Sequence, residues 1–507
     1  MLGPTLRSRL IAGTWPAYAL ALIAGMISVT AFAPFGAFWV LPLTLAVLFR
    51  LADSRTVRRA AAIGLAFGIG QFGAGTYWIL IALSGVGGAP LPLAVGLLLG
   101  LIVLLAAFIA LSLGVAARIA PHPGALRYLI WLPILWTLVE WLRSWVFSGF
   151  PWLSAGYSQI ASPLVGIVPI LGVFGASWAV ALSAGALAWA STQPRRAPWA
   201  IALLIVLWTG AFGLRHVHWT TPNSKPLSVT LVQGDIAQQA KWSPESVNQA
   251  IYRYGDLTRG HWQSDLVIWP ETAIPDYYRS VKPALENLGK RLAKHDTTLI
   301  TGLLRASDDG QHIYNSVVAV GAGNGLYAKR HLVPFGEYFP VPEIVRRWMA
   351  ESGMPYSDLT PGAAHQKPIV AGQLALGISI CYEDIFGDLI ASDVPPANVL
   401  VNVSDDAWFG RSIGPDQHFE IARMRAVETG RYLLRADNSA VTGIVAPSGV
   451  VVARAPDFKS TALTGHFRSY TGLTPFAHWG NDGVVVLALA IGGLAALGQW
   501  LRSRRRR

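Results

Sequence analysis

The sequence predicts a helical membrane protein that carries a water-exposed α/β domain. Three observations lead to this fold class. Hydrophobic residues make up 53% of the 507 residues and charged residues only 13%, about half of the roughly 25% that is usual in soluble domains. Of the 28 Asp and Glu residues, only Asp53 and Glu140 lie in residues 1–220. Long apolar stretches fill this first part, whereas strand-like and helix-like patterns alternate in the part that follows.

Eight apolar stretches are predicted to span the membrane as helices, because about 20 mostly apolar residues are needed to cross a bilayer. They lie at residues 10–30, 35–51, 61–83, 89–117, 127–147, 163–190, 198–214 and 483–501. The second and the seventh are short and give the weakest signals. We therefore divide the chain into a seven-helix membrane domain (1–219), an α/β domain (220–475), and a last span with a basic tail (476–507).

The distribution of basic residues predicts the orientation of these spans. One set of loops and ends is rich in arginine: Arg7, Arg9, Arg50, Arg55, Arg58, Arg59, Arg118, Arg127, Arg195, Arg196 and the tail Arg502–Arg507. The alternate loops, near residues 31–36, 84–90 and 148–162, contain no Lys or Arg. By the positive-inside rule, both termini are cytoplasmic and the α/β domain is extracytoplasmic. We expect a multi-pass inner-membrane protein with this domain in the periplasm, and the net charge of +12 gives no reason to expect nucleic-acid binding.

Two local features qualify this topology. Ala31-Phe32-Ala33 resembles a signal-peptidase site, but Pro34 follows it directly, so we expect the first span to remain uncleaved. In the fifth span, Glu140 and Arg143 are three residues apart and can pair on one helical face. The loop after this span contains Phe150 and Trp152, which suit either an ordinary aromatic belt or a place where lipid substrate is contacted.

Most strand-like runs in the α/β domain have polar residues at or near their ends, as functional strands of α/β folds do. The runs lie at residues 228–236, 265–272, 297–304, 374–385 and 398–406, with helical stretches at 244–263, 280–294 and 416–430 and a hairpin-like segment at 313–340. Glu271 follows one strand, Lys329 lies in the hairpin, and Cys381, the single cysteine, ends another strand. Each has a bland interpretation, as a helix cap, a surface lysine and a core cysteine. Together they supply the base, the cation and the thiol that acyl transfer requires.

Three motifs around these residues resemble a known superfamily. WPET (269–272), KRHLVPFGEYFP (329–340) and SICYED (379–384) are similar to the three catalytic motifs of the nitrilase, or carbon–nitrogen hydrolase, superfamily, and they occur in the same order. The resemblance covers roughly residues 226–470 and implies a Glu–Lys–Cys triad of Glu271, Lys329 and Cys381 on an αββα sandwich. With the predicted spans added, the whole chain resembles the apolipoprotein N-acyltransferase family.

This resemblance implies a reaction. A fatty acyl chain would pass from a glycerophospholipid to Cys381 as a thioester, and then to the α-amine of the N-terminal diacylglyceryl-cysteine of an apolipoprotein. Glu271 would move the protons, and Lys329 would stabilise the oxyanion together with the backbone N–H after Cys381. No cofactor is implied, and we expect a monomer.

The resemblance also implies supporting residues. Glu337 matches the second glutamate that positions the lysine, and Tyr382 and Glu383 flank and orient the nucleophile; fold-stabilising hydrogen bonds are the alternative role for both glutamates. Trp242 matches a tryptophan on an arm that contacts lipid. The stretch 405–410 and His418 follow a further family pattern that lines the site, without a defined role.

Other functions are less well supported by the sequence. A metal site is not expected, because His331 and His418 lack the spacing of metal ligands, and a structural role is the simpler interpretation of His418. A membrane-tethered amidase or nitrilase would use the same triad with water as the acceptor, but eight spans are more than a tether needs. A transporter is expected to carry more ionisable residues in its spans than Glu140 and Arg143.

Overall fold

The protein divides into two compact units, which are described separately. The structure, a computed structural model, describes residues 14–53, 56–241, 246–339, 344, 347 and 358–504. A helical unit comprises Met1–Leu80, Leu91–His218 and Trp479–Arg507, and an α/β unit comprises Ile81–Pro90 and Trp219–His478. Trp242 lies outside the described residues.

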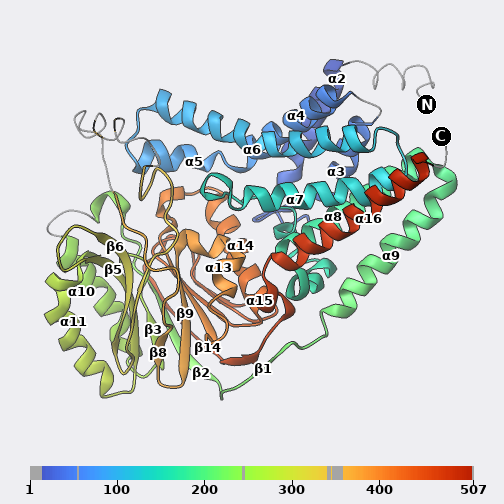
Figure 1. The fold of residues 1–507 in the computed structure, drawn as a ribbon. Coiled ribbons are helices and arrows are strands. Elements are labelled where there is room, and N and C mark those ends of the chain that lie inside the picture. Colours follow the sequence, from blue (N-terminus) through green and yellow to red (C-terminus); the bar gives the residue numbers. More distant parts are fainter. Residues whose placement is uncertain are drawn as a thin grey trace. The chain divides into compact units, whose positions relative to one another are not determined.

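The helical unit has a helix in each of the eight predicted apolar stretches (Figure 1). These are α2 (Thr14–Ser28), α3 (Val40–Leu51), α4 (Val57–Gly75), α6 (Leu91–Ile119), α7 (Leu132–Arg143), α8 (Val168–Thr192), α9 (Ala197–Leu214) and α16 (Asp482–Arg504). Within the described residues, four helical segments are long and apolar enough to cross a membrane: Leu91–Ile119, Pro163–Thr192, Pro194–Leu214 and Asp482–Arg504. A fifth candidate is the pair Val57–Gly75 and Trp78–Val86, which is bent by 54°. The crossing of all eight helices remains a prediction.

Glu140 and Arg143, at the end of α7, both bind the loop that follows this helix. Glu140 Oε1 accepts hydrogen bonds from the indole of Trp136 at 2.8 Å and from the backbone N–H of Ala155 at 2.9 Å. The Arg143 guanidinium donates to the carbonyl oxygens of Phe150 at 2.9 Å and Trp152 at 2.5 Å. The two charged side chains therefore form hydrogen bonds with backbone groups of an irregular loop that would otherwise be buried without partners. Their role inside the apolar unit is thus to stabilise this loop.

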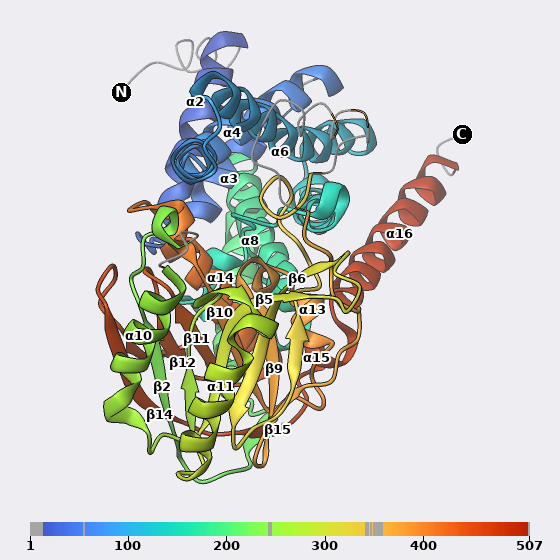
Figure 2. The ribbon, with the colours of Figure 1, turned by 90° about the vertical axis from the view of Figure 1, so that its left-hand side faces the viewer.

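The α/β unit is built on two stacked sheets (Figure 2). One sheet has the order β14-β2-β3-β5-β6-β7, with β4 beside β5, and the other has the order β13-β12-β11-β10-β9-β8. The strands of the first sheet are β2 (Leu227–Gln233), β3 (Leu266–Ile268), β4 (Ile274–Tyr277), β5 (Thr298–Ala306), β6 (Ile313–Gly321), β7 (Leu326–Ala328) and β14 (Thr461–Phe467). Those of the second are β8 (Ile369–Ala371), β9 (Leu374–Ile380), β10 (Val399–Ser404), β11 (Leu433–Asp437), β12 (Gly443–Val445) and β13 (Val451–Arg454). Strands β2, β3 and β5 are parallel, as are β9, β10 and β11.

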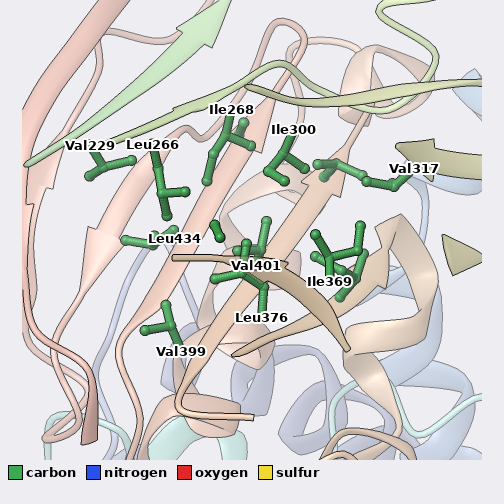
Figure 3. Close-up of a cluster of buried hydrophobic side chains, with 14 of the residues drawn as sticks. Val229, Leu266, Ile268, Ile300, Val317, Ile369, Leu376, Val399, Val401 and Leu434 are labelled. Atoms are coloured by element: carbon green, nitrogen blue, oxygen red, sulfur yellow. The ribbon is translucent and has the colours of Figure 1, made fainter. Parts of the chain in front are cut away.

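Three apolar clusters give this unit four layers. The inner cluster lies between the sheets, where Ile268 and Ile300 of one sheet face Val401 and Leu434 of the other (Figure 3). A second cluster packs α10 (Ser246–Thr258) and α11 (Tyr278–Ala293) on the outer face of the first sheet. A third packs α13 (Gly387–Ala391) and α14 (Gly414–Thr429) on the outer face of the second sheet. Alternate residues of the central strands thus enter two different cores, as Ile268 and Val267 of β3 do, because successive side chains point to opposite faces. The predicted α/β domain is confirmed, with helix–sheet–sheet–helix layering.

Parallel strands direct the polar residues of this unit to one end of the sheets. Glu271 follows β3, Cys381 follows β9, and Asp405 and Asp406 follow β10. Since the carboxyl ends of parallel strands lie at the same sheet edge, residues far apart in the sequence meet there.

Candidate active site

Cys381 occupies a sharp turn between β9 and the short helix η10 (Cys381–Ile385). Its φ is +50°, a left-handed conformation that is strained for a residue with a side chain. The turn directs the thiol away from the sheet. The Cys381 side chain also packs against the core between the sheets. Burial, together with the negative charge of Glu271, raises the pKa of the Cys381 thiol well above its ordinary value, although Lys329 and the Ser404 hydroxyl act in the opposite sense. The thiol is therefore neutral at rest and needs a base beside it.

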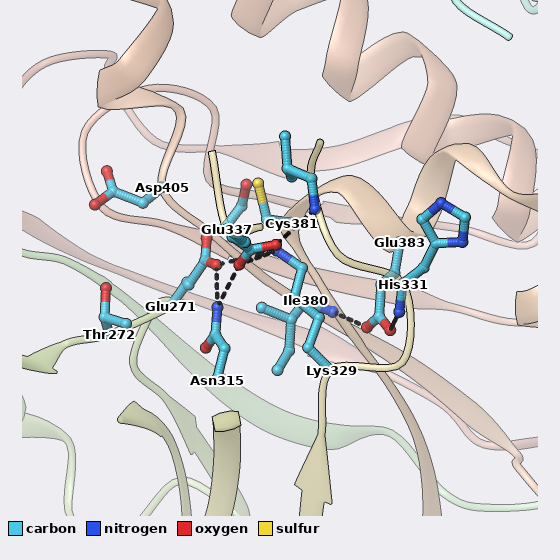
Figure 4. Close-up of polar contacts among 12 residues, drawn as sticks. Glu271, Thr272, Asn315, Lys329, His331, Glu337, Ile380, Cys381, Glu383 and Asp405 are labelled. Carbon is cyan, nitrogen blue, oxygen red and sulfur yellow. Dashed lines mark hydrogen bonds and ion pairs between the residues drawn. The ribbon is translucent and has the colours of Figure 1, made fainter. Parts of the chain in front are cut away.

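Glu271 is placed to be that base. Its Oε1 accepts a hydrogen bond from the Asn315 amide at 2.7 Å and lies 3.5 Å from Lys329 Nζ. Burial raises the pKa of the Glu271 carboxyl, whereas the nearby Lys329 lowers it. Figure 4 shows the Cys381 sulfur and the carboxylates of Glu271 and Glu337 gathered at one place. A carboxylate of raised pKa can accept a thiol proton and return it, which is the requirement for acid–base catalysis near neutral pH.

Lys329 follows β7 and remains cationic despite its burial. Its Nζ donates to Glu337 Oε1 at 2.8 Å, and its side chain is only 1% exposed. Burial lowers the pKa of Lys329, but the carboxylates of Glu337 and Glu271 outweigh it and raise that pKa above its ordinary value. Glu337 is itself fixed, because its Oε2 accepts from the backbone N–H of Val333 at 2.8 Å. The predicted pairing of Glu337 with Lys329 is thus present in the structure.

Glu383 joins the two loops that carry Lys329 and Cys381. One carboxylate oxygen accepts from the backbone N–H groups of Arg330 at 2.6 Å and His331 at 3.1 Å, and the other accepts from that of Ile380 at 2.8 Å. The Tyr327 hydroxyl completes this set at 2.9 Å. Burial raises the pKa of Glu383 to about 7, against the lowering effect of these hydrogen bonds. Tyr382, its neighbour, is buried and has its ring 5.4 Å from that of Phe386.

Asn315 and Lys241, which help to organise this site, were not identified from the sequence, and Asp405 was identified only as part of the stretch 405–410 that was expected to line it. The Asn315 amide, on β6, donates to both Glu271 and Glu337, the latter at 3.1 Å. Lys241 and Asp405 form a buried ion pair beside Thr272, the residue after Glu271. An asparagine inside an otherwise apolar strand, IYNSVV, is a polar group that must find a partner, and this signal could have identified Asn315.

Two predicted lipid-contact residues belong to the helical unit. Trp152 is 1% exposed, and its ring lies 5.7 Å from that of Phe150 and 4.9 Å from that of Trp78. Both residues are held by Arg143 through their carbonyl oxygens.

One group near the site has the ligand types of a metal centre. Ligand atoms of Cys381, Asp406 and His418 lie within 4.8 Å of one another. Both ring nitrogens of His418 are already bonded to carboxylates, at 2.9 Å to Asp384 and 2.8 Å to Asp406. The Arg435 guanidinium also lies 2.8 Å from each of these carboxylates. A side-chain cation therefore occupies the position that a metal ion would need, and these residues do not fit a metal site.

Comparisons with known proteins cover both units. Residues 24–186 match the family model of the apolipoprotein N-acyltransferase N-terminal domain, and residues 228–475 match that of the carbon–nitrogen hydrolases. A protein named apolipoprotein N-acyltransferase from Methylococcus capsulatus is 42% identical over 94% of this chain and 95% of its own length. Proteins of the same name are 41% identical in Chromobacterium violaceum, over 95% of this chain and 94% of theirs, and 38% in Vibrio cholerae, over 96% and 97%.

Proposed function

The chain belongs to the apolipoprotein N-acyltransferase family, and we propose that it transfers a fatty acyl chain from a glycerophospholipid to an apolipoprotein. The acceptor is the α-amine of the N-terminal diacylglyceryl-cysteine. The observation that carries the mechanism is the meeting of a neutral thiol, a carboxylate of raised pKa and a buried ammonium at the carboxyl ends of the strands. These groups belong to Cys381, Glu271 and Lys329.

In the first half-reaction, Cys381 attacks the ester carbonyl of the phospholipid. Glu271 takes the thiol proton as the S–C bond forms, and Lys329 stabilises the negative charge on the carbonyl oxygen together with the backbone N–H after Cys381. The ester C–O bond then breaks. The leaving alkoxide recovers the proton from Glu271 and departs as lysophospholipid, which leaves the acyl chain on sulfur.

In the second half-reaction, the neutral amine of the diacylglyceryl-cysteine attacks the thioester. The same cationic environment stabilises the second tetrahedral intermediate, in which an N–C bond has formed. Glu271 accepts a proton from nitrogen as the C–S bond breaks, and it returns this proton to the Cys381 thiolate. The products are the amide and the free thiol, so the proposed cycle is ping-pong.

The neighbouring residues support these steps by position. Glu337 holds the Lys329 ammonium 2.8 Å from its own carboxylate, so that the cation keeps one location through both intermediates. Glu383 and Tyr382 fix the turn that carries the nucleophile. Glu383 accepts hydrogen bonds from the backbone N–H groups of Arg330, His331 and Ile380. Its carboxylate therefore holds two loops together as well as orienting the nucleophile, although burial raises its pKa to about 7.

The membrane frame supplies the lipid in this proposal. Residues 1–219 and 476–507 form the membrane domain with eight spans, and residues 220–475 form the catalytic domain on the periplasmic side of the inner membrane, with both termini cytoplasmic. Phe150 and Trp242 contact lipid, whereas Trp152, which is 1% exposed and stacked on Phe150, supports the loop from inside and is not a lipid contact. The enzyme acts as a monomer. The arginine-rich loops and the apolar helices support this arrangement. An amidase that uses water as the acceptor is not favoured, because residues 24–186 match the membrane domain of N-acyltransferases.

Mass spectrometry of the purified protein tests the mechanism. After incubation with phosphatidylethanolamine vesicles, the peptide that contains Cys381 should gain one acyl mass that hydroxylamine removes. Cys381→Ala and Glu271→Gln should show no adduct. Addition of a diacylglyceryl-cysteine peptide should discharge the adduct and yield the N-acyl peptide. Unimpaired N-acylation by Cys381→Ala would refute the thioester, and release of free fatty acid without N-acyl peptide would support the amidase-like alternative.

A further inference from the structure

A cluster of four buried charges lies behind the nucleophile and has no part in the proposed proton transfers. It consists of Asp384, Asp406, His418 and Arg435, and we call it the buried charge cluster. All four side chains are at most 1% exposed. They come from η10, from η11 (Asp406–Phe409), from α14 and from β11. The cluster therefore ties together the segments that surround Cys381 in the second sheet.

The distances define the charge state of His418. Its Nε2 lies 2.9 Å from Asp384 Oδ1 and its Nδ1 lies 2.8 Å from Asp406 Oδ1. Carboxylates accept hydrogen bonds, so these two contacts favour a proton on each ring nitrogen, although Arg435 Nη2, which can only donate, also lies 3.0 Å from Nδ1. The two carboxylates raise the pKa of His418 to about 9, although burial lowers it. With Arg435 the cluster holds two cations and two anions, which makes its burial tolerable.

One member of the cluster belongs to the turn of the nucleophile. Asp384 lies three residues after Cys381 within η10. Its carboxylate is hydrogen-bonded to His418 and accepts a hydrogen bond from Arg435 at 2.8 Å. Arg435 also donates to Asn402 Oδ1 at 2.5 Å, and the Asn402 amide contacts the carbonyl oxygen of Cys381 at 3.4 Å. The strained turn is thus held from two sides by charged hydrogen bonds.

The Ser404 hydroxyl connects the cluster to the sulfur. Ser404 is fully buried at the end of β10. Its Oγ donates to Asp406 Oδ1 at 3.0 Å and accepts from Arg435 at 3.2 Å. Val403 of β10 pairs with Ile380 of β9, so Ser404 and Cys381 are the next residues of adjacent parallel strands, and the sulfur lies within 4.8 Å of a carboxylate oxygen of the same Asp406. The Ser404 hydroxyl lowers the pKa of the Cys381 thiol. A hydroxyl has one proton to donate. Because His418 and Arg435 already satisfy Asp406, this proton can turn to the sulfur when Cys381 loses its own.

We propose that Ser404 and His418 are additional residues of the acyl-transfer machinery: Ser404 donates to the Cys381 thiolate, and His418 is a positioning residue that keeps this donor available. The inference rests on the proposed thioester at Cys381. When Glu271 removes the thiol proton, negative charge develops on the sulfur, and the Ser404 O–H stabilises it until the S–C bond forms. Without His418, Asp406 retains the Ser404 proton and the sulfur loses its donor.

Alkylation of the single cysteine tests this role without any lipid. Iodoacetamide labelling of the full-length protein is followed against pH in wild type, Ser404→Ala, His418→Gln and Ser264→Ala. Ser264 is a matched control, since it is buried and its hydroxyl bonds to Thr230 at 2.8 Å, at the amino end of β3. The charged or titratable groups that face the sulfur are Glu271, Lys329, Tyr382, Asp406, His418 and Arg435, and Ser404→Ala changes none of them.

The alkylation midpoint of Cys381 should move to higher pH in Ser404→Ala and not in Ser264→Ala. The rate of acyl-thioester formation should fall about tenfold to a hundredfold, with the KM for phospholipid and the melting temperature little changed. The Ser404→Ala/His418→Gln double variant should be no slower than the slower single variant, because both act on one donor. If His418→Gln does not fold, Ser404→Ala decides alone.

The two proposals fail in different ways. A wild-type alkylation profile and acylation rate in Ser404→Ala, with Cys381→Ala inactive, would overturn only the role of Ser404 and His418. An equal loss in Ser404→Ala and Ser264→Ala would also overturn it, since the effect would then come from packing. Activity of Cys381→Ala would overturn the thioester itself.

Discussion

Asn315 places one amide group between the carboxylates of Glu271 and Glu337. Its two hydrogen bonds reduce the repulsion between these carboxylates. Its Nδ2 lies 2.7 Å from Glu271 Oε1 and 3.1 Å from Glu337 Oε1, while Lys329 Nζ lies 3.5 Å and 2.8 Å from the same two atoms. The amide therefore shares with the ammonium the task of holding two carboxylates close together. Two carboxylates close together disfavour each other's ionisation. The Asn315 amide offsets this effect and so keeps Glu271 available as a base.

Asn315→Asp should severely impair acyl transfer. The substitution replaces a donor with a third carboxylate of the same shape, which repels Glu271 and Glu337 and raises the pKa of Glu271 further. We expect thioester formation at pH 7 to slow by about tenfold or more, measured as the acyl adduct on Cys381 over time. Asn287→Asp makes the same chemical change on the exposed face of α11 and should leave the rate unchanged. A normal rate in Asn315→Asp would contradict the role assigned to the amide.

The predictability of these residues depended on whether a local pattern marked them. Glu271, Lys329 and Cys381 lie in short motifs, and the structure brings them together as the motifs imply. Asp384 ends the SICYED motif and His418 follows a further family pattern, but neither pattern indicated their partners, because these contacts link positions up to 51 residues apart. Arg435 lies in no motif, and a charged residue in a sequence is normally expected at the surface. The structural role of His418 remains a prediction, and the two carboxylates that hold its ring, those of Asp384 and Asp406, could not be identified from its neighbours in the sequence.

At the scale of elements, the buried charge cluster makes the packing of α14 against η10 and η11 depend on the charge of one histidine. The pKa of His418 is raised to about 9 by Asp384 and Asp406 against the effect of burial, compared with about 6.5 in an unfolded chain. A base whose pKa is higher in the folded state stabilises the fold fully below its unfolded pKa. This contribution, roughly 3 kcal/mol for a shift of this size, is lost as the pH rises through the folded pKa.

Thermal unfolding in detergent should reveal this dependence. The melting temperature of wild type should fall between pH 6.5 and pH 9.5 or so as the His418 imidazolium loses its proton. His418→Gln should melt at a lower temperature than wild type at pH 6, because Asp384 and Asp406 are then buried without their cation, and the gap should narrow as the pH rises. Glu383 is common to both proteins and, within the described part of the chain, forms no hydrogen bond with His418, so its titration cancels in the comparison. A gap that is constant from pH 6 to pH 10 would show that His418 contributes by shape alone.

Element boundaries were predictable where periodicity was strong. The predicted strands at 228–236, 265–272, 297–304, 374–385 and 398–406 each overlap an observed strand, and the three predicted helical stretches overlap α10, α11 and α14; β2, β5, α11 and α14 extend beyond the predicted bounds. The later strands β11 to β14 were missed. β11 is interrupted by Arg435 and Asp437, which are buried charges. β12 and β13 are only three and four residues long, and β14 mixes apolar and polar residues, so none of them gives a clear pattern. The loop around Phe150 is held by hydrogen bonds from Arg143 to the carbonyl oxygens of Phe150 and Trp152. Backbone contacts of this kind leave no pattern in the sequence, so they were not predicted.

At the scale of the whole molecule, acidic residues are almost confined to the part of the chain after residue 220. Asp53 and Glu140 are the only acids before residue 221, and both are buried beside hydrogen-bond donors, Asp53 next to Arg50 and Glu140 next to Trp136. Carboxylates elsewhere in that part of the chain would face lipid at a high cost in free energy. The arginines of this part lie in loops or near helix ends, as Arg50, Arg118 and Arg143 do, and their uneven placement between alternate loops carries the predicted orientation signal.

Cysteine accessibility in cells tests that orientation. In a Cys381→Ala background, Lys282→Cys on α11 and Gln193→Cys, between α8 and α9, each introduce one exposed thiol. If the α/β unit is periplasmic, a membrane-impermeant maleimide should label Lys282→Cys in intact spheroplasts and should label Gln193→Cys only after lysis. Gln193 is preferred to Arg195 because its replacement leaves the charge of the loop intact, and with it the signal under test. The reverse pattern would place the thioester chemistry in the cytoplasm, and labelling of both sites before lysis would require an even number of crossings between residues 193 and 282.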